Sequence, residues 1–272
     1  MEKWICKTCG TQFPASEQQP EGCPICLDER QYVGFNGQQW TTLARMQQDG
    51  FHNEFREHEL HLTGIASTPT FAIGERALLV QHEQGNILWD CMTLLDDETV
   101  ARIERLGGLS AIAISHPHYY STMVEWADRF DIPIYLHEAD RQWVMRPSGR
   151  IHFWSGETHR LPNGMTLIRL GGHFSGGTVL HWLEGADGKG ALLSGDIITV
   201  VPDRRWVSFM YSYPNLIPLP ASEIRRIRDT IEPYQFERLY AAWFEREVKR
   251  NAHSAVMRSA ERYIRALESV RQ

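Results

Sequence analysis

The sequence predicts an α/β protein, a four-layer αβ/βα sandwich of two sheets between helices, preceded by a small knuckle with four cysteines. Strand-like runs come first in hairpins, from about residue 62 to 90, and later alternate with helical segments. This order suits two sheets with helices on their outer faces. Two Cys-x-x-Cys pairs near the N-terminus predict the knuckle.

Composition places the chain among soluble globular proteins. It has 272 residues, of which 42% are hydrophobic and 23% charged, with a formal charge of −6. No apolar run approaches the 18 or so residues that would span a membrane, and no secretion signal is evident, so we expect a cytoplasmic protein that does not bind membranes. The acidic balance and the absence of a basic run argue against nucleic acid as a partner. The expected partner is a small-molecule substrate.

The four N-terminal cysteines have the spacing of a metal site. Cys6-Lys-Thr-Cys9 and Cys23-Pro-Ile-Cys26 are two tight turns that can close a tetrahedral four-sulfur site. In a reducing compartment this spacing favours a metal over disulfides. About 30 residues bury too little apolar surface to fold alone, so the metal would supply folding energy. We predict a knuckle over residues 1–35, a linker and helix over 36–61, and the main domain over 62–272.

The main domain is expected to contain the following elements. The predicted strands are Thr68–Ile73, Ala77–Gln81, Asn86–Asp90, Ala111–Ile114, Ile132–Leu136, Ala191–Leu193 and Arg238–Trp243. The predicted helices are Asp96–Leu106, Thr122–Phe130, Ala221–Ile231 and one from about Asn251 to the end. Thr122 and Glu125 form a capping-box pattern at the start of the second helix.

Four polar residues follow predicted strands or glycine turns. His116 and His118 lie two apart after a buried strand, and an extended segment would point both imidazoles the same way. His173 follows two glycines, and Asp196 follows a strand that ends in glycine. We predict that loops at the strand ends bring these side chains to one metal ion.

The N-terminal segment resembles rubredoxin-like and zinc-ribbon knuckles. The resemblance covers about the first 35 residues and rests on Trp4 to Gly10 and on Cys23-Pro24-Ile25-Cys26. It implies either a structural zinc or a redox iron held by Cys6, Cys9, Cys23 and Cys26. We expect zinc, because nothing else in the chain suggests an electron-transfer partner.

Residues from about 62 to 245 resemble the metallo-β-lactamase superfamily, whose pattern is HxHxDH, a loop His, a strand-end Asp and a late His. His116-Pro117-His118, His173 and Asp196 match three of these features. Tyr120 and Ser121 replace the DH pair, and the strand ending in Trp243-Phe244 lacks the late His. His253 follows too late to be expected as its substitute. The resemblance therefore implies one pocket ion in place of two.

The leading hypothesis is a zinc-dependent hydrolase with His116, His118 and His173 as ligands. Asp196 would ligate the ion, hold the water or accept a proton, and Tyr119 or Tyr120 would donate to a developing oxyanion. The first alternative is a redox protein with iron in the knuckle. The second is a degenerate, non-catalytic metal-binding protein, suggested by the three missing ligands.

Overall fold

The computed structural model of the protein describes residues 1–269. The chain divides into two compact parts, Met1–Trp154 and Ser155–Gln272. The domain limits expected at residues 35 and 61 stay a prediction. Within the described residues, every helix is too short or too polar to cross a membrane.

The first part begins with a three-stranded antiparallel sheet in the order β2-β1-β3. Its elements are β1 (Glu2–Cys6), β2 (Gln12–Ser16), α1 (Pro24–Leu27), β3 (Trp40–Thr41) and α2 (Leu43–Gln48). Thr42 caps α2, because its side chain accepts a hydrogen bond from the Arg45 amide. The buried core is small and consists of Trp4, Ile25, Trp40 and the four cysteines.

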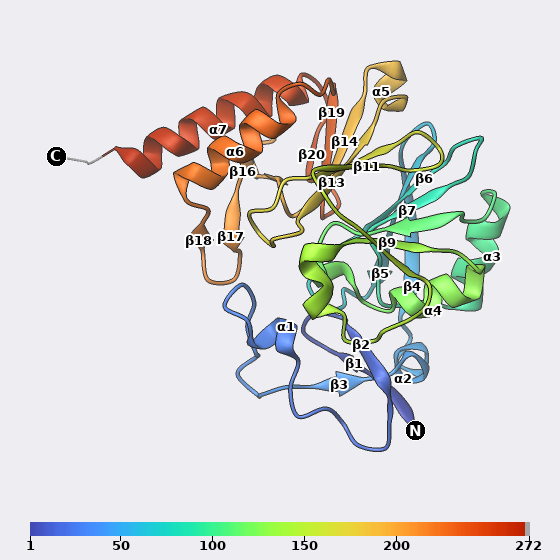
Figure 1. Ribbon diagram of the computed structural model, residues 1–272. Helices are drawn as coiled ribbons and strands as arrows, with labels where there is room; N and C mark the ends of the chain where they lie inside the picture. The colour runs from blue at the N-terminus through green and yellow to red at the C-terminus, as the bar shows by residue number, and fades with distance from the viewer. Residues whose placement is uncertain (270–272) are drawn as a thin grey trace. The chain divides into compact units, whose positions relative to one another are not determined.

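A seven-stranded mixed sheet in the order β10-β9-β8-β7-β6-β5-β4 forms the body of the first part (Figure 1). Its strands are β4 (His52–Glu59), β5 (Leu62–Thr68), β6 (Ala77–Val80), β7 (Ile87–Trp89), β8 (Ala111–Ala113), β9 (Ile134–His137) and β10 (Ile151–Trp154). Strands β4 to β7 are antiparallel and β7 to β10 are parallel. The carboxyl ends of β7 and β8 therefore meet at one edge, where polar loops gather.

The remaining elements of the first part are α3 (Asp97–Arg105), η1 (Pro117–Tyr119), α4 (Met123–Phe130) and η2 (Glu138–Trp143). The predicted capping box of α4 is wrong. Thr122 caps no amide of the helix, because its hydroxyl instead contacts the main-chain oxygens of Met92 and Thr93 at 3.2 and 2.7 Å. The predicted strand Thr68–Ile73 is also wrong. Strand β5 ends at Thr68, where Pro69 brings no amide hydrogen for a ladder.

The second part is built on a six-stranded sheet in the order β11-β12-β13-β14-β19-β20. Its strands are β11 (Thr158–Arg160), β12 (Thr166–Arg169), β13 (Thr178–Trp182), β14 (Ala191–Gly195), β19 (Arg238–Ala241) and β20 (Glu247–Val248). Two small hairpins lie between β14 and β19 in the chain: β15 (Thr199–Val200) with β16 (Val207–Ser208), and β17 (Met210–Ser212) with β18 (Ile217–Pro218).

Two helices pack together in the second part, α6 (Ala221–Ile231) and α7 (Ala252–Glu268), as Figure 1 shows. A short α5 (Gly185–Gly188) precedes β14. Ile224, Ile227 and Ile231 are buried on one face of α6, the i, i+3, i+7 spacing of an amphipathic helix. Each such isoleucine stabilises the fold by about 1.5–3 kcal/mol. The core that they join also includes Leu192 of β14 and Leu239 of β19, so it fixes the strand that Asp196 follows.

Candidate metal centres

The knuckle brings its four cysteines together in a buried cluster. Cys6, Cys9, Cys23 and Cys26 are at most 2% exposed, and their sulfurs lie within 4.8 Å of one another. The sulfurs of Cys6 and Cys26 are 3.5 Å apart and those of Cys9 and Cys23 are 3.6 Å apart. Four thiolates held tetrahedrally at about 2.3 Å from a zinc ion would be about 3.8 Å apart. The donor set therefore fits one tetrahedral ion.

The charges of the cluster also favour a cation. Hydrogen bonds from the neighbouring thiols, Cys23 first, lower the pKa of Cys6 well below its usual range. The hydrogen bond with Cys23 raises the pKa of both Cys9 and Cys26, and burial adds to this. The Gln38 side-chain amide also donates to the Cys6 sulfur at 3.1 Å. Deprotonation of Cys6 is thus favoured, whereas deprotonation of Cys9 and Cys26 is opposed unless a cation balances their negative charge.

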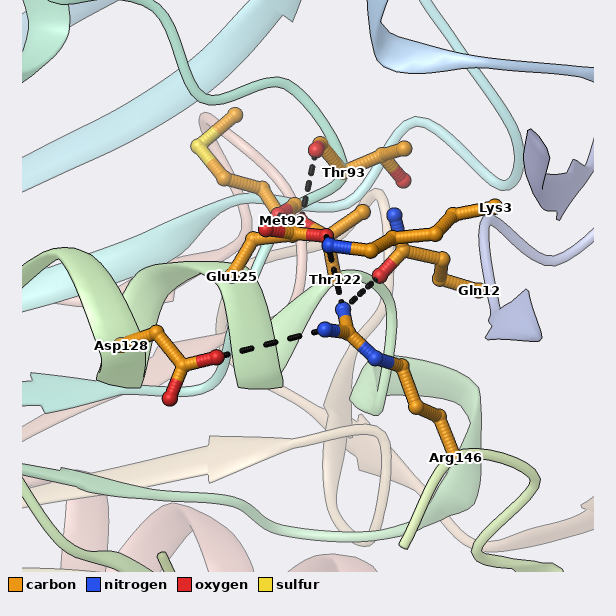
Figure 2. A network of polar contacts seen from close by, with 8 residues as sticks. All are labelled: Lys3, Gln12, Met92, Thr93, Thr122, Glu125, Asp128 and Arg146. Atoms are coloured by element: carbon orange, nitrogen blue, oxygen red, sulfur yellow. Dashed lines mark hydrogen bonds and ion pairs between the residues drawn. The ribbon is translucent and has the colours of Figure 1, made fainter. Parts of the chain in front are cut away.

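A network of charged contacts ties the knuckle to helix α4 (Figure 2). Lys3 lies 2.7 Å from Oε1 of Glu125, and Arg146 lies 2.8 Å from the same oxygen. The Arg146 guanidinium also donates to the side-chain oxygen of Gln12 and lies 4.0 Å from Asp128. Arg146 thus joins a knuckle strand and α4 through one side chain.

Backbone contacts join the knuckle to the chain just beyond the two histidines. The Gln12 amide donates to the Ser121 main-chain oxygen at 2.9 Å. The Thr93 hydroxyl lies 3.4 Å from the Gly10 oxygen. Gly10 has φ +78°, and a Cβ there would lie 2.3 Å from the Thr93 hydroxyl, so only glycine allows this approach. The knuckle therefore supports the loop that follows η1.

His116 and His118 are brought together by a helical turn. The extended segment expected here is wrong: His116 is extended, but Pro117 to Tyr119 form the 3₁₀ turn η1. The two rings meet edge to face with centroids 5.0 Å apart. They are 1% and 2% exposed. The Nδ1 atom of His116 lies 2.8 Å from the Ser115 hydroxyl, which makes Nε2 the candidate ligand atom.

A buried carboxylate that was not among the predicted site residues lies close to this turn. Asp90 follows β7 and is 1% exposed, and its carboxylate accepts from the Ser115 amide at 2.7 Å. Burial raises the pKa of Asp90 to about 7, although hydrogen bonds from Ser115 favour the charged form. Asp90 therefore fixes the residue before His116 at the end of a neighbouring strand.

Asp90→Asn should flatten the pH dependence of stability. The unfolded pKa of an aspartate is about 3.9, so between about pH 4 and pH 7 the folded protein holds one more proton. The free energy of unfolding then falls by about 1.4 kcal/mol per pH unit through this window as pH rises. Urea unfolding from pH 4 to 8 should show that this component is missing in Asp90→Asn and present in Asp97→Asn, an exposed control on α3. An unchanged slope in Asp90→Asn would contradict the assignment.

His173 is held by a glycine turn after β12. It is fully buried, and its Nδ1 atom lies 2.8 Å from the Tyr211 main-chain oxygen. This contact favours a proton on Nδ1 and makes Nε2 the candidate ligand atom. Gly172 has φ +78°, and a Cβ there would lie 2.8 Å from a Leu219 methyl carbon, so the turn requires glycine.

Asp196 directly follows β14 and is 2% exposed. Its main-chain oxygen accepts from the Tyr213 hydroxyl at 2.6 Å. The Tyr213 ring also lies edge-on to His173, with centroids 5.6 Å apart. Burial raises the pKa of Tyr213 well above its usual value, so the hydroxyl stays a donor. Tyr213 thus positions the two candidate ligands of the second part.

His116, His118, His173 and Asp196 are a group of buried side chains that could hold a metal ion. Each offers one ligand atom, and these atoms lie within 4.8 Å of one another. Three neutral imidazoles and a carboxylate are a donor set that zinc accepts. The predicted metal-ligating residues of the pocket are therefore close together, and their roles as ligands stay a prediction.

The two tyrosines predicted to act in catalysis are buried. The Tyr119 ring lies edge-on to His116, with centroids 5.3 Å apart. Tyr120 lines a small cavity with Gln12 and Arg146, on the side of the knuckle. Burial first, and then the charge of Asp140, raise the pKa of Tyr120 well above its usual value. Their catalytic roles stay a prediction.

The positions expected to lack metal ligands carry other contacts. The Ser121 hydroxyl lies 3.3 Å from the Cys91 main-chain oxygen. Beyond β19 the chain continues with Ala242 and Trp243. His253 lies in the first turn of α7, where its Nε2 atom is 2.9 Å from the Glu232 oxygen. His253 is therefore bound to a neighbouring loop and is not part of the metal group.

Comparison with known proteins gives the family. No family model matches the sequence. The uncharacterized protein YmaE of Bacillus subtilis (strain 168) is 57% identical over 270 residues, which cover 99% of this chain and 98% of YmaE. The chain belongs to the YmaE family. This likeness extends over the knuckle as well as the two parts that carry the histidines.

Solved structures give the fold of this YmaE-family chain. The DIM-1 metallo-β-lactamase has a TM-score of 0.58 at 13% identity, covering 78% of this chain and 98% of DIM-1. FIM-1 from Pseudomonas aeruginosa, in a mono-zinc form, gives 0.58 at 13%, covering 78% and 96%. A B3 metallo-β-lactamase with an active-site glutamic acid gives 0.54 at 15%, covering 84% and 93%. The chain thus has the predicted metallo-β-lactamase fold.

Proposed function

We propose that the protein is a metal-dependent hydrolase of small molecules with one pocket zinc ion. His116, His118 and His173 would hold the ion, and Asp196 would ligate it or orient the attacking water. The observation that carries this proposal is the buried group of three imidazoles and one carboxylate. The metallo-β-lactamase fold supports it.

The residues of the chain suit hydrolysis. When bound, zinc would supply Lewis acidity and an activated water at neutral pH. Neutral imidazoles leave the positive charge of the ion undiminished, and Asp196 can accept the proton that the water releases. For an ester, water adds to the acyl carbon and the acyl–oxygen bond breaks, which gives a carboxylic acid and an alcohol. Tyr119, whose ring lies edge-on to His116, is the proposed donor to the developing oxyanion.

A substrate screen tests the proposal. Zinc-loaded protein should hydrolyse at least one member of a set that contains an aryl ester, a thioester, a lactone and a phosphodiester. His118→Ala should lower that rate by about a hundredfold or more, because even residues that only support a metal ligand cost ten- to a hundredfold. His152→Ala, an exposed histidine on β10, should leave the rate unchanged.

Three outcomes would overturn the proposal. Inactivity towards all four substrate classes, in protein shown to carry the pocket metal, would favour a non-catalytic metal-binding protein. Iron in the knuckle with reversible redox bleaching, and no hydrolysis, would favour a redox protein. Equal rates in the wild type and in His118→Ala would show that any hydrolysis arises elsewhere.

A further inference from the structure

The second part contains an apolar groove that the proposed hydrolytic chemistry does not use. Its volume is about 620 Å³. The apolar residues that line it include Val200, Met210, Leu216, Trp243 and Phe244. They come from β15, from the β17–β18 hairpin and from the turn after β19. A groove of this size matches the 300–1,000 Å³ of most small-molecule sites.

One cation lines this groove without forming an ion pair among the described residues. Arg246 is partly buried, and across residues 1–269 its guanidinium has neither an ion pair nor a side-chain hydrogen bond. Its neighbours differ: Arg204 lies 3.5 Å from Glu245, and Arg205 lies 2.9 Å from Asp203. A guanidinium with unused donors matches the two oxygens of a carboxylate or a phosphate. Arg246 therefore supplies charge complementarity for an anion with an apolar body.

Tyr213 connects the groove with two candidate metal ligands. It lines the groove and meets the Trp243 ring at 6.0 Å between centroids. The same ring lies 5.6 Å from the His173 ring, and its hydroxyl donates to the Asp196 oxygen. A molecule in the groove would thus be one aromatic ring away from His173 and Asp196.

We propose that this groove binds the apolar chain of an amphipathic anion, whose carboxylate or phosphate is held by Arg246. This inference rests on the proposed function, since it names the class of substrate or product: a small ester, thioester or phosphodiester with an apolar chain and one anionic group. The groove sets the length of the chain that is accepted, and Arg246 sets the charge.

Calorimetric titration of the purified protein tests this inference without turnover. The probes are octanoate, decanoate and dodecanoate, with dodecyl phosphate and dodecan-1-ol, all kept below their micelle or solubility limits. Affinity should rise about fourfold for each added methylene, which corresponds to about 0.8 kcal/mol per buried CH₂. Arg246→Gln should weaken binding of the four anions about tenfold and leave binding of the alcohol unchanged. The ratio between carboxylate and phosphate tells which headgroup is preferred.

Two further variants keep the test decisive. Leu216 is 79% exposed with φ +56°, a conformation that asparagine tolerates, so Leu216→Asn should fold and should weaken all the probes alike. Arg160→Gln, an exposed arginine on β11, should change nothing. Affinity that is independent of chain length, or equal in Arg246→Gln and the wild type, would overturn the inference. Binding to anionic vesicles without binding to dodecanoate would also overturn it, since the surface would then contact a membrane.

The outcome is separable from that of the hydrolase proposal. His118→Ala should still bind dodecanoate with unchanged affinity, because the groove contains no residue of the first part. Affinity that rises with the length of the probe's apolar chain, in a protein that hydrolyses none of the four substrate classes, would support the groove inference and contradict the hydrolase proposal. Hydrolysis without any binding of these anions would support the hydrolase proposal and contradict the groove inference.

Discussion

Cys23→Ser should remove the knuckle metal and locally unfold residues 1–41, while the seven-stranded sheet remains folded. The apolar core of the knuckle is small, so the cluster depends on the metal for its stability. Structural zinc supplies about 10–16 kcal/mol in small zinc domains at pH 7, and a three-thiolate site retains only part of this. Substitution of any of the four cysteines should have a similarly large effect.

Metal analysis and hydrogen exchange check this expectation. The metal content should fall by about one ion per chain. The amides of Cys6 and Gly10, which bond within the knuckle, should lose protection, and so should the Gln12 amide, which donates from the knuckle to Ser121. Cys91→Ser is the matched control, because Cys91 is a buried cysteine outside the cluster. Full metal content and protection in Cys23→Ser would contradict a four-cysteine site. A red colour of the wild-type protein would indicate that the knuckle holds iron and not zinc.

The consequences of losing this metal should extend to the loop after η1. Gln12 donates to the Ser121 oxygen and Gly10 contacts Thr93, so the knuckle fixes backbone only three residues beyond His118. We expect faster hydrogen exchange at the Gln12 amide to be accompanied by a weaker affinity of the pocket for its metal ion. The knuckle thereby acts as a support for the histidine loop, in addition to its own site.

Elements with a clear period could be predicted from the sequence. Helix α6 has the predicted bounds Ala221–Ile231, because its isoleucines recur at helical spacing. Strand β8 was predicted because a short apolar run suits a strand buried on both faces. Strand β4 was not predicted, since the charged residues of HNEFREHE hide its pairing with β5. Such charges are typical of an exposed edge strand.

The candidate ligands could be predicted, but their supports could not. His116, His118, His173 and Asp196 follow strands or glycine turns, which a sequence displays directly. Tyr213 contacts Asp196 across 17 positions, and the Tyr211 oxygen contacts His173 across 38. No local pattern predicts such contacts. The capping pattern at Thr122 misled because the hydroxyl is used by Met92 and Thr93, some 30 positions earlier.

His118→Ala should remove the pocket metal and leave the knuckle metal in place, so that the total should fall from about two ions per chain to about one. The reason is the donor set: removal of one imidazole reduces the four donors to three, two imidazoles and the Asp196 carboxylate, and the weakened site should lose its ion during exhaustive dialysis. Metal analysis after exhaustive dialysis measures the total. Thermal unfolding of the variant, compared with His152→Ala, separates loss of metal from loss of fold.

The same measurement decides between one pocket ion and two. Tyr120 faces the small cavity with Gln12 and Arg146, Ser121 contacts Cys91, and His253 is bound to Glu232, so no second set of donors is available at these three positions. His253→Ala should therefore keep the wild-type metal content, and the wild type should stop at about one pocket ion even with excess zinc. A third tightly bound ion per chain, lost on His253→Ala, would mean that α7 moves to supply the late ligand. The hydrogen bond from His253 to the Glu232 oxygen, which holds the ring beside Phe236, argues against such a movement.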